Sequence, residues 1–174
     1  MQQLTIFKTL LIFLFVIQEN SCRQLKMKQL ECLTYDPEYA KFDLCELDTS
    51  LRNNPTLSIA IRLLTIPVTN INLRVEFGLL GSSPPIIVLN NSWDGCAFLK
   101  SRKSNKVFGR LYRYIAPYTN LNHSCPINHD VIIKNLTVAE GGSALAMLGG
   151  EFVAKVYAAS DGKTRISIKV TSSY

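Results

Sequence analysis

The segment Ile71-Asn72-Leu73-Arg74-Val75-Glu76-Phe77 alternates without exception between apolar and polar side chains. Successive side chains of a β-strand point to opposite faces, so this period of two predicts a strand with one buried and one exposed face. Residues 57–63 alternate in the same way, and Pro67 marks a bend between the two segments. We therefore expect the segments to form an antiparallel pair. Its inward side chains would be Leu57, Ile59, Ile61, Leu63, Ile71, Leu73, Val75 and Phe77.

Other parts of the chain carry the same strand pattern. Residues 152–157 alternate, and Ser160-Asp161-Gly162 then predicts a turn into a final strand. The inward residues of that strand would be Ile166, Ile168 and Val170. With residues 86–89, residues 131–138 and two early runs, the chain has about eight strand candidates with one apolar face each. This pattern predicts a mainly β fold, an antiparallel β-sandwich.

Residues 94–118 interrupt the alternation. Here the apolar residues recur at helical spacing, and basic residues occupy the opposite face. The basic positions are Lys103, Lys106, Arg110 and Arg113. We expect one amphipathic helix, closed by Pro117, as an insertion in the β fold. Its positive face suits anionic lipid headgroups or sulfated glycans, and the alternative is an ordinary solvated helix face.

The N-terminus predicts export from the cell. Lys8 precedes an apolar run at residues 10–17, and polar residues follow. This order is typical of a secretory signal peptide, and the run is shorter than the ~20 residues of a membrane-spanning helix. We expect a signal peptide at residues 1–22 and a single extracellular domain at residues 23–174. The composition, 47% apolar and 18% charged, excludes collagen, coiled coil and disorder.

The cysteines fit an oxidising compartment. Cys22 lies at the predicted cleavage boundary, which leaves Cys32, Cys45, Cys96 and Cys125 in the mature chain. The sequence alone does not choose among the possible pairings, although sequence separation favours Cys32–Cys45 and Cys96–Cys125. A turn signal at residues 35–38 means that a Cys32–Cys45 bond would staple a hairpin.

Three glycosylation sequons support the secreted interpretation. Their asparagines are Asn90, Asn122 and Asn135. A separate apolar segment, residues 144–148, lies between two glycine pairs. This segment would either fold over a ligand opening or insert into a membrane surface. The alternative is a loop that places its leucines in the core.

Catalytic motifs are missing. The chain has only two histidines, His123 and His129, and neither a nucleophile elbow nor a phosphate-binding loop. These histidines and Cys125 give too few ligands for a zinc site. The aromatic residues of the basic segment fall on its apolar side, which disfavours nucleic acid as a partner. We expect a protein that is not an enzyme and that uses no cofactor or metal.

Two cysteine-centred segments carry a family resemblance. They are Asp94-Gly95-Cys96-Ala97-Phe98-Leu99 and Tyr118-Thr119-Asn120-Leu121-Asn122-His123-Ser124-Cys125-Pro126. The chain resembles an insect family of small secreted proteins of unknown function that includes the chemosensory CheB proteins. The resemblance implies an immunoglobulin-like β-sandwich similar to the ML lipid-recognition fold and the ganglioside activator protein, in which two sheets separate to admit a lipid. The family's proline before the late glycine is replaced here, where Leu148-Gly149-Gly150 stands.

The resulting hypothesis is a secreted binding protein for a lipid or other hydrophobic ligand, and the resemblance adds a chemosensory signal as one such ligand. The ligand would lie between the sheets, against the inward residues of the three alternating strands. If the sheets close, the same residues form an ordinary core. The alternative function is then an extracellular interaction module that binds a receptor, a glycan or a membrane surface through its basic helix.

Overall fold

The computed structural model describes residues 26–50, 54–81, 86–137 and 150–173. The expected signal peptide and the apolar segment at 144–148 lie outside the described residues. The strands are β1 (Lys26–Thr34), β2 (Ala40–Asp48), β3 (Thr56–Leu63), β4 (Asn72–Leu80), β5 (Ile86–Asp94), β6 (Val131–Leu136), β7 (Glu151–Ser160) and β8 (Lys163–Ser173). The helices are α2 (Gly95–Lys100), α3 (Lys106–Ile115) and the 3-10 turn η1 (Ala116–Tyr118).

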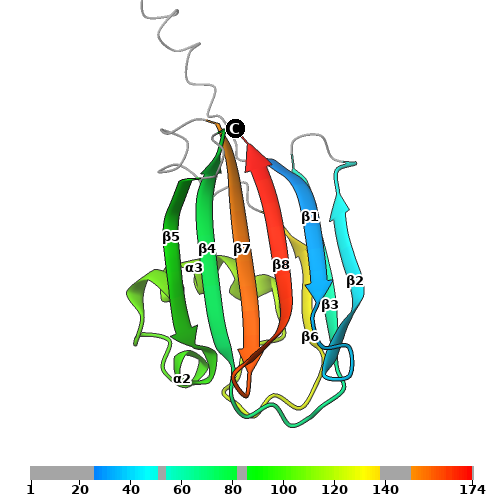
Figure 1. The fold of residues 1–174 in the computed structure, drawn as a ribbon, viewed down its shortest axis with the longest axis vertical. Coiled ribbons are helices and arrows are strands. Elements are labelled where there is room, and N and C mark those ends of the chain that lie inside the picture. Colours follow the sequence, from blue (N-terminus) through cyan, green and yellow to red (C-terminus); the bar gives the residue numbers. More distant parts are fainter. Residues whose placement is uncertain (1–25, 51–53, 82–85, 138–149, 174) are drawn as a thin grey trace, which may run out of the picture.

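The strands form two antiparallel sheets in a sandwich-like arrangement (Figure 1). One sheet has five strands in the order β1-β8-β7-β4-β5, and the other has three in the order β2-β3-β6. The predicted mainly β, antiparallel fold is therefore confirmed. The packed core joins both sheets through Leu57, Ile59 and Ile61 of β3, Met27 of β1 and Ile166 of β8.

The expected pairing of residues 57–63 with residues 71–77 is wrong. Strand β3 lies between β2 and β6, whereas β4 lies between β5 and β7 in the other sheet. The connecting segment crosses from one sheet to the other, and Val68 exchanges two backbone hydrogen bonds of 2.8 and 2.9 Å with Ile127. Alternation had identified the buried face of each strand, but it carries no information about which strand lies alongside.

Both disulfides pair as sequence separation favoured, Cys32 with Cys45 and Cys96 with Cys125. The expected role of the first bond is wrong, because it does not staple a hairpin. Cys32 lies on β1, an edge of the five-stranded sheet, and Cys45 lies on β2, an edge of the three-stranded sheet. The bond therefore joins the two sheets along one side of the molecule.

The single basic helix is also wrong, because two separate helices occupy this region. The Asp94 carboxylate accepts a hydrogen bond of 2.9 Å from the Ala97 amide, and the Asn105 side chain accepts one of 2.9 Å from the Phe108 amide. Each bond caps the start of one helix. Residues 101–105 therefore form a loop, and Lys103 lies in that loop instead of on the helix.

Two strand boundaries differ from expectation. Strand β5 runs to Asp94 instead of ending at Leu89, because it pairs with β4 along its length. Strand β6 begins at Val131 as expected and ends at Leu136. The sequon asparagine Asn90 consequently lies within a strand.

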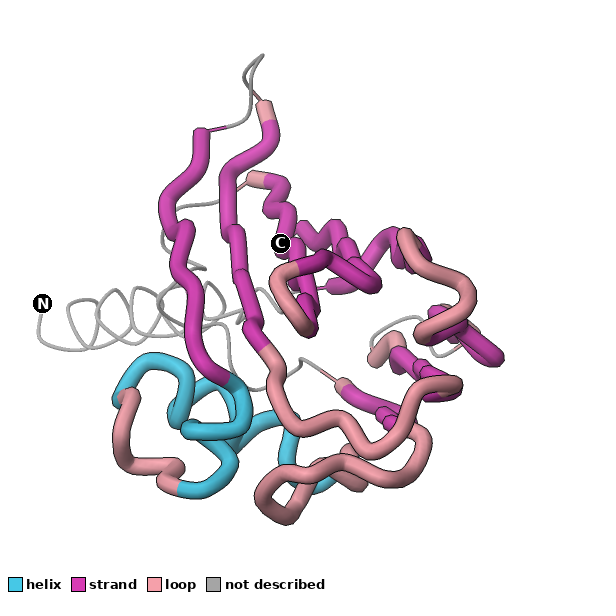
Figure 2. The backbone as a smooth tube through the Cα atoms, turned by 60° about the horizontal axis from the view of Figure 1, so that its bottom comes forward, coloured by secondary structure: helices cyan, strands magenta, loops and turns pink. Residues whose placement is uncertain are grey.

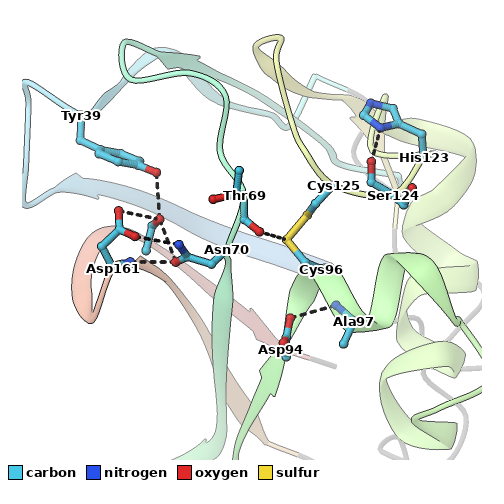
Figure 3. The surroundings of a disulfide bond; sticks show 11 residues. Tyr39, Thr69, Asn70, Asp94, Cys96, Ala97, His123, Ser124, Cys125 and Asp161 are labelled. Atoms are coloured by element: carbon cyan, nitrogen blue, oxygen red, sulfur yellow. Dashed lines mark hydrogen bonds between the residues drawn. A yellow bond between two sulfur atoms is a disulfide. The ribbon is translucent and has the colours of Figure 1, made fainter.

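A polar network with a buried centre at Tyr39 and Ser160 joins three connections at the lower end of the sandwich (Figure 3). The Tyr39 hydroxyl donates 2.9 Å to the Ser160 hydroxyl, which in turn donates 3.2 Å to the Asn70 side chain. The Asn70 side-chain amide donates 2.7 Å to the Asp161 carboxylate. These contacts join the β1–β2 connection, the crossover and the β7–β8 turn.

We expect Tyr39→Phe to lower the free energy of unfolding by about 1 kcal/mol, because it removes a buried hydrogen bond. Tyr35→Phe is the matched control, since its hydroxyl contacts Ser167 in an exposed position. The control should change stability by less than about 0.5 kcal/mol. Urea unfolding of the two variants measures both values. Equal losses would show that the Tyr39 hydrogen bond does not contribute specifically to stability.

Candidate functional site

The inner face of the five-stranded sheet gathers the apolar residues that the sequence singled out. Strand register aligns β4, β7 and β8 so that their side chains form rows across the sheet. The rows are Leu73–Ala158–Ile166, Val75–Val156–Ile168 and Phe77–Ala154–Val170. Residues from three distant parts of the sequence therefore share one apolar surface.

The eleven expected lining residues divide into two groups by burial. Five are buried: Leu57, Ile59, Ile61, Val75 and Ile166. Six are half-buried: Leu63, Ile71, Leu73, Phe77, Ile168 and Val170. Ile71 differs from the others in its place, because it precedes β4 and its carbonyl accepts a 2.7 Å hydrogen bond from the Gly95 amide.

Three inward residues on central strands of the larger sheet are half-buried. Phe77, Val156 and Ile168 lie on β4, β7 and β8, and each of these strands has a neighbour on both sides. The apolar inner face is therefore only partly covered at these three positions.

Part of the inner face of the five-stranded sheet lies outside the packed core cluster. From the five-stranded sheet, this cluster takes residues of β1 and β8 together with Ala158 of β7. Val75, Phe77 and Phe152 lie on the same inner face, outside the cluster as it is formed by the described residues. Phe77 and Phe152 stack with ring centroids 5.6 Å apart. Phe152 and Val75 are buried at 1% and 8% exposed, whereas Phe77 is half-buried, so only part of this region of the inner face is accessible.

Two devices bound this surface. On one side the Cys32–Cys45 bond joins the sheets. On the other side, α2 and α3 lie behind the lower part of β4 and β5, and Figure 2 shows both helices on one side of the molecule. Aromatic rings attach them, since Trp93 stacks on Phe108 at 4.9 Å and Phe98 meets both Phe108 and Tyr112 edge-on.

The distal end of β5 is strongly apolar and exposed. Ile86 is 58% exposed and Ile87 is 51% exposed, and they pair with Leu79 and Gly78 of β4. Gly78 is required by this approach, because a Cβ atom there would lie 2.9 Å from the Ile86 carbonyl oxygen.

Sequence reasoning missed the contribution of β7. Val156 lies between Lys155 and Tyr157, so an alternation signal was available there, but neither Val156 nor Phe152 was assigned to the lining. It also missed the aromatic cluster of Trp93, Phe98 and Phe108. No periodic pattern marks that cluster, because its members come from three different elements.

The expected basic residues lie on the outside of the molecule. Lys103, Lys106, Arg110 and Arg113 are all exposed. Leu111 and Tyr114, at 40% and 51% exposed, accompany them on the surface of α3. None of the four basic residues forms an ion pair with another described residue.

The three sequon asparagines, Asn90, Asn122 and Asn135, are also exposed. In the described ranges no three histidines, cysteines or acidic residues gather in a way that could hold a metal ion. Cys125, which sequence reasoning had considered beside the two histidines, is bonded to Cys96. No helix of the described part of the chain is long and apolar enough to cross a bilayer. The two disulfides are consistent with an extracellular or secreted protein.

A domain described as a protein of unknown function, DUF1091, is found at residues 69–153. This segment contains β4, β5, both helices, β6 and the first residues of β7, together with the Cys96–Cys125 bond. No curated protein matches the sequence.

Proposed function

We propose that this chain is a secreted, non-enzymatic binding protein that holds a lipid or another hydrophobic ligand between its two sheets. The observation that carries the proposal is the accessible apolar surface of Phe77, Val156 and Ile168 on three central strands. A water-filled space with such a lining is unfavourable, and an apolar ligand gains roughly 25 cal/mol for each Å² that it removes from water.

The resemblance to the ML lipid-recognition fold and to the chemosensory CheB proteins supports the same function. In the proposed arrangement the larger sheet forms the bed of the site, and the smaller sheet together with the helices forms its cover. Binding requires no catalytic group, which agrees with the scarcity of catalytic motifs in the sequence. The ligand class follows from the lining, which offers apolar side chains and an aromatic pair.

Binding of a neutral apolar dye, N-phenylnaphthylamine, tests the proposal, because a neutral probe is not attracted by the basic residues. We expect Phe77→Gln to weaken dye binding about tenfold, which corresponds to ~1.4 kcal/mol of lost apolar contact. Glu76→Gln is the matched control, since Glu76 is adjacent but faces the outside of the sheet. The control should change the affinity less than twofold.

A second variant separates an open space from a filled core. We expect Val156→Phe to weaken dye binding while it leaves the stability within about 1 kcal/mol, because the larger ring enters accessible space. In a closed core the same change would overpack the interior and cost about 1–3 kcal/mol. That loss of stability, or a wild-type protein that binds no dye, would favour the alternative of an interaction module with a closed core and a basic binding surface.

A further inference from the structure

A basic pocket lies outside the two sheets, where two loops meet. Residues 99–103, at the end of α2, form one wall, and residues 122–124 form the other. The pocket has a volume of about 510 Å³ and opens to solvent. Its existence does not depend on a ligand between the sheets.

Covalent and hydrogen bonds hold the two walls in place. The Cys96–Cys125 bond joins α2 to the second loop, as Figure 3 shows. The Arg102 guanidinium donates from Nη2 to the Asn122 carbonyl oxygen, directly across the pocket. Helix α3 packs on the Arg102 backbone, since a Cβ atom at Gly109 would lie 2.9 Å from the Arg102 carbonyl oxygen. The pocket is therefore preformed, which lowers the entropic cost of binding.

Three cations line this pocket without any acidic partner. Lys100, Arg102 and Lys103 are among the lining residues, and the lining contains no carboxylate. None of the three forms an ion pair with another residue in the described ranges. All three side chains are exposed and carry the same charge, so they create a local positive potential that attracts an anion.

Arg102 is held by contacts within the protein and has N–H donors left over. Its guanidinium lies 5.0 Å from the centre of the Tyr112 ring, and one of its N–H groups is used by Asn122. A guanidinium has five N–H donors in a planar fork, so others remain for an acceptor with two oxygens. The two lysines add point charges beside it.

His123 belongs to the wall and not to the ligand contacts. Its Nδ1 lies 2.7 Å from the Ser124 carbonyl oxygen, so that nitrogen donates a hydrogen bond. Its Nε2 lies 2.7 Å from Nε2 of His129. Both ring nitrogens thus have partners within the protein, and the ring is fixed in position. Ligand contacts fall to the three cations.

We propose that this pocket binds a tetrahedral oxyanion, the sulfate or phosphate group of an ester. Such a group accepts a bidentate pair from arginine and leaves oxygens for both lysines. The basic run continues through Lys106, Arg110 and Arg113 with no acidic residue between Lys100 and Arg113.

Calorimetric titration with a sulfated heparin disaccharide and, separately, with glycerol phosphate tests the proposal and distinguishes the two sources of the group. We expect the doubly changed Lys100→Gln, Lys103→Gln protein to bind the preferred ligand at least about tenfold more weakly, as expected for lost charge-assisted hydrogen bonds. The matched control, Arg110→Gln with Arg113→Gln, removes the same charge from α3 outside the pocket and should lose less than about threefold. Among the described residues, no side chain of either pair forms an ion pair. Arg102 is left intact because it holds the Asn122 loop.

Three results would overturn the proposal. The first is a wild-type protein that binds neither ligand. The second is an equal loss in the two doubly changed proteins, which would mean that a diffuse field and not the pocket attracts the anion. The third concerns Asn122, which is exposed and lines the pocket. If mass spectrometry finds this asparagine fully glycosylated and if Asn122→Gln is needed for binding, the pocket serves the glycan and not an oxyanion ligand.

Discussion

Replacing Ile127 by alanine should lower the free energy of unfolding by about 2–5 kcal/mol, one of the largest losses that a single change in this chain can cause. Ile127 is 0% exposed although it lies in the connection between η1 and β6 and not in a strand. Its backbone is bonded to Val68 in the crossover between the sheets, and its side chain belongs to the packed core. The change would leave a cavity where both sheets and the Cys125 loop meet.

Ile132→Ala provides the matched control. The same methyl and methylene groups are removed there, but Ile132 is 43% exposed on β6. The loss should be less than about 1 kcal/mol. Urea unfolding at neutral pH measures both variants, and similar losses would show that Ile127 is not a centre of the fold.

Removing the bond between the sheets is the second large effect. We expect the double change Cys32→Ala, Cys45→Ala to destabilise the protein by about 3 kcal/mol, as for a closed loop of this size. Cys32 lies on β1, which pairs with β8 in the larger sheet. Cys45 lies on β2, which pairs with β3 in the smaller sheet. Stability should therefore be lost because the two sheets are no longer linked covalently, while the strand pairing inside each sheet is retained.

Hydrogen exchange and peptide mapping check this second expectation. Backbone amides of β3 and β7 should keep their relative order of protection in the variant, while the global stability falls. In the unchanged protein, a digest made without reduction should contain the Cys32–Cys45 and Cys96–Cys125 peptides. A Cys32–Cys96 peptide, or a variant of unchanged stability, would contradict the two-sheet arrangement.

Local sequence patterns predict which face of a strand is buried, but they do not predict which strand lies beside it. Alternation at residues 57–63 and 71–77 identified which side chains turn inward, because that depends only on the pleat of each strand. It could not show that β3 and β4 belong to different sheets, since partner choice depends on contacts between residues far apart in the chain. The hairpin of β7 and β8 was predictable because its turn residues, Ser160-Asp161-Gly162, lie next to both strands.

The helical region shows the same limit at a smaller scale. Helical spacing predicted one continuous helix, but Asn105 caps a second start and divides the basic residues between a loop and α3. The pocket of residues 99–103 and 122–124 could not be read from the sequence at all, because the Cys96–Cys125 bond brings together two loops that are distant in the chain. Its cations were visible as a charge run, but the second wall was not.

The lipid content of the secreted protein tests the central claim most directly. The full chain would be expressed in an insect secretory host, purified without detergent and extracted with organic solvent, and the extract would be quantified by mass spectrometry against an unrelated secreted protein. We expect the extract to contain a lipid or other apolar compound in an amount close to one per protein. The Val156→Phe protein should carry less of this compound. An extract indistinguishable from that of the control protein, together with no binding of the neutral dye, would contradict the central claim.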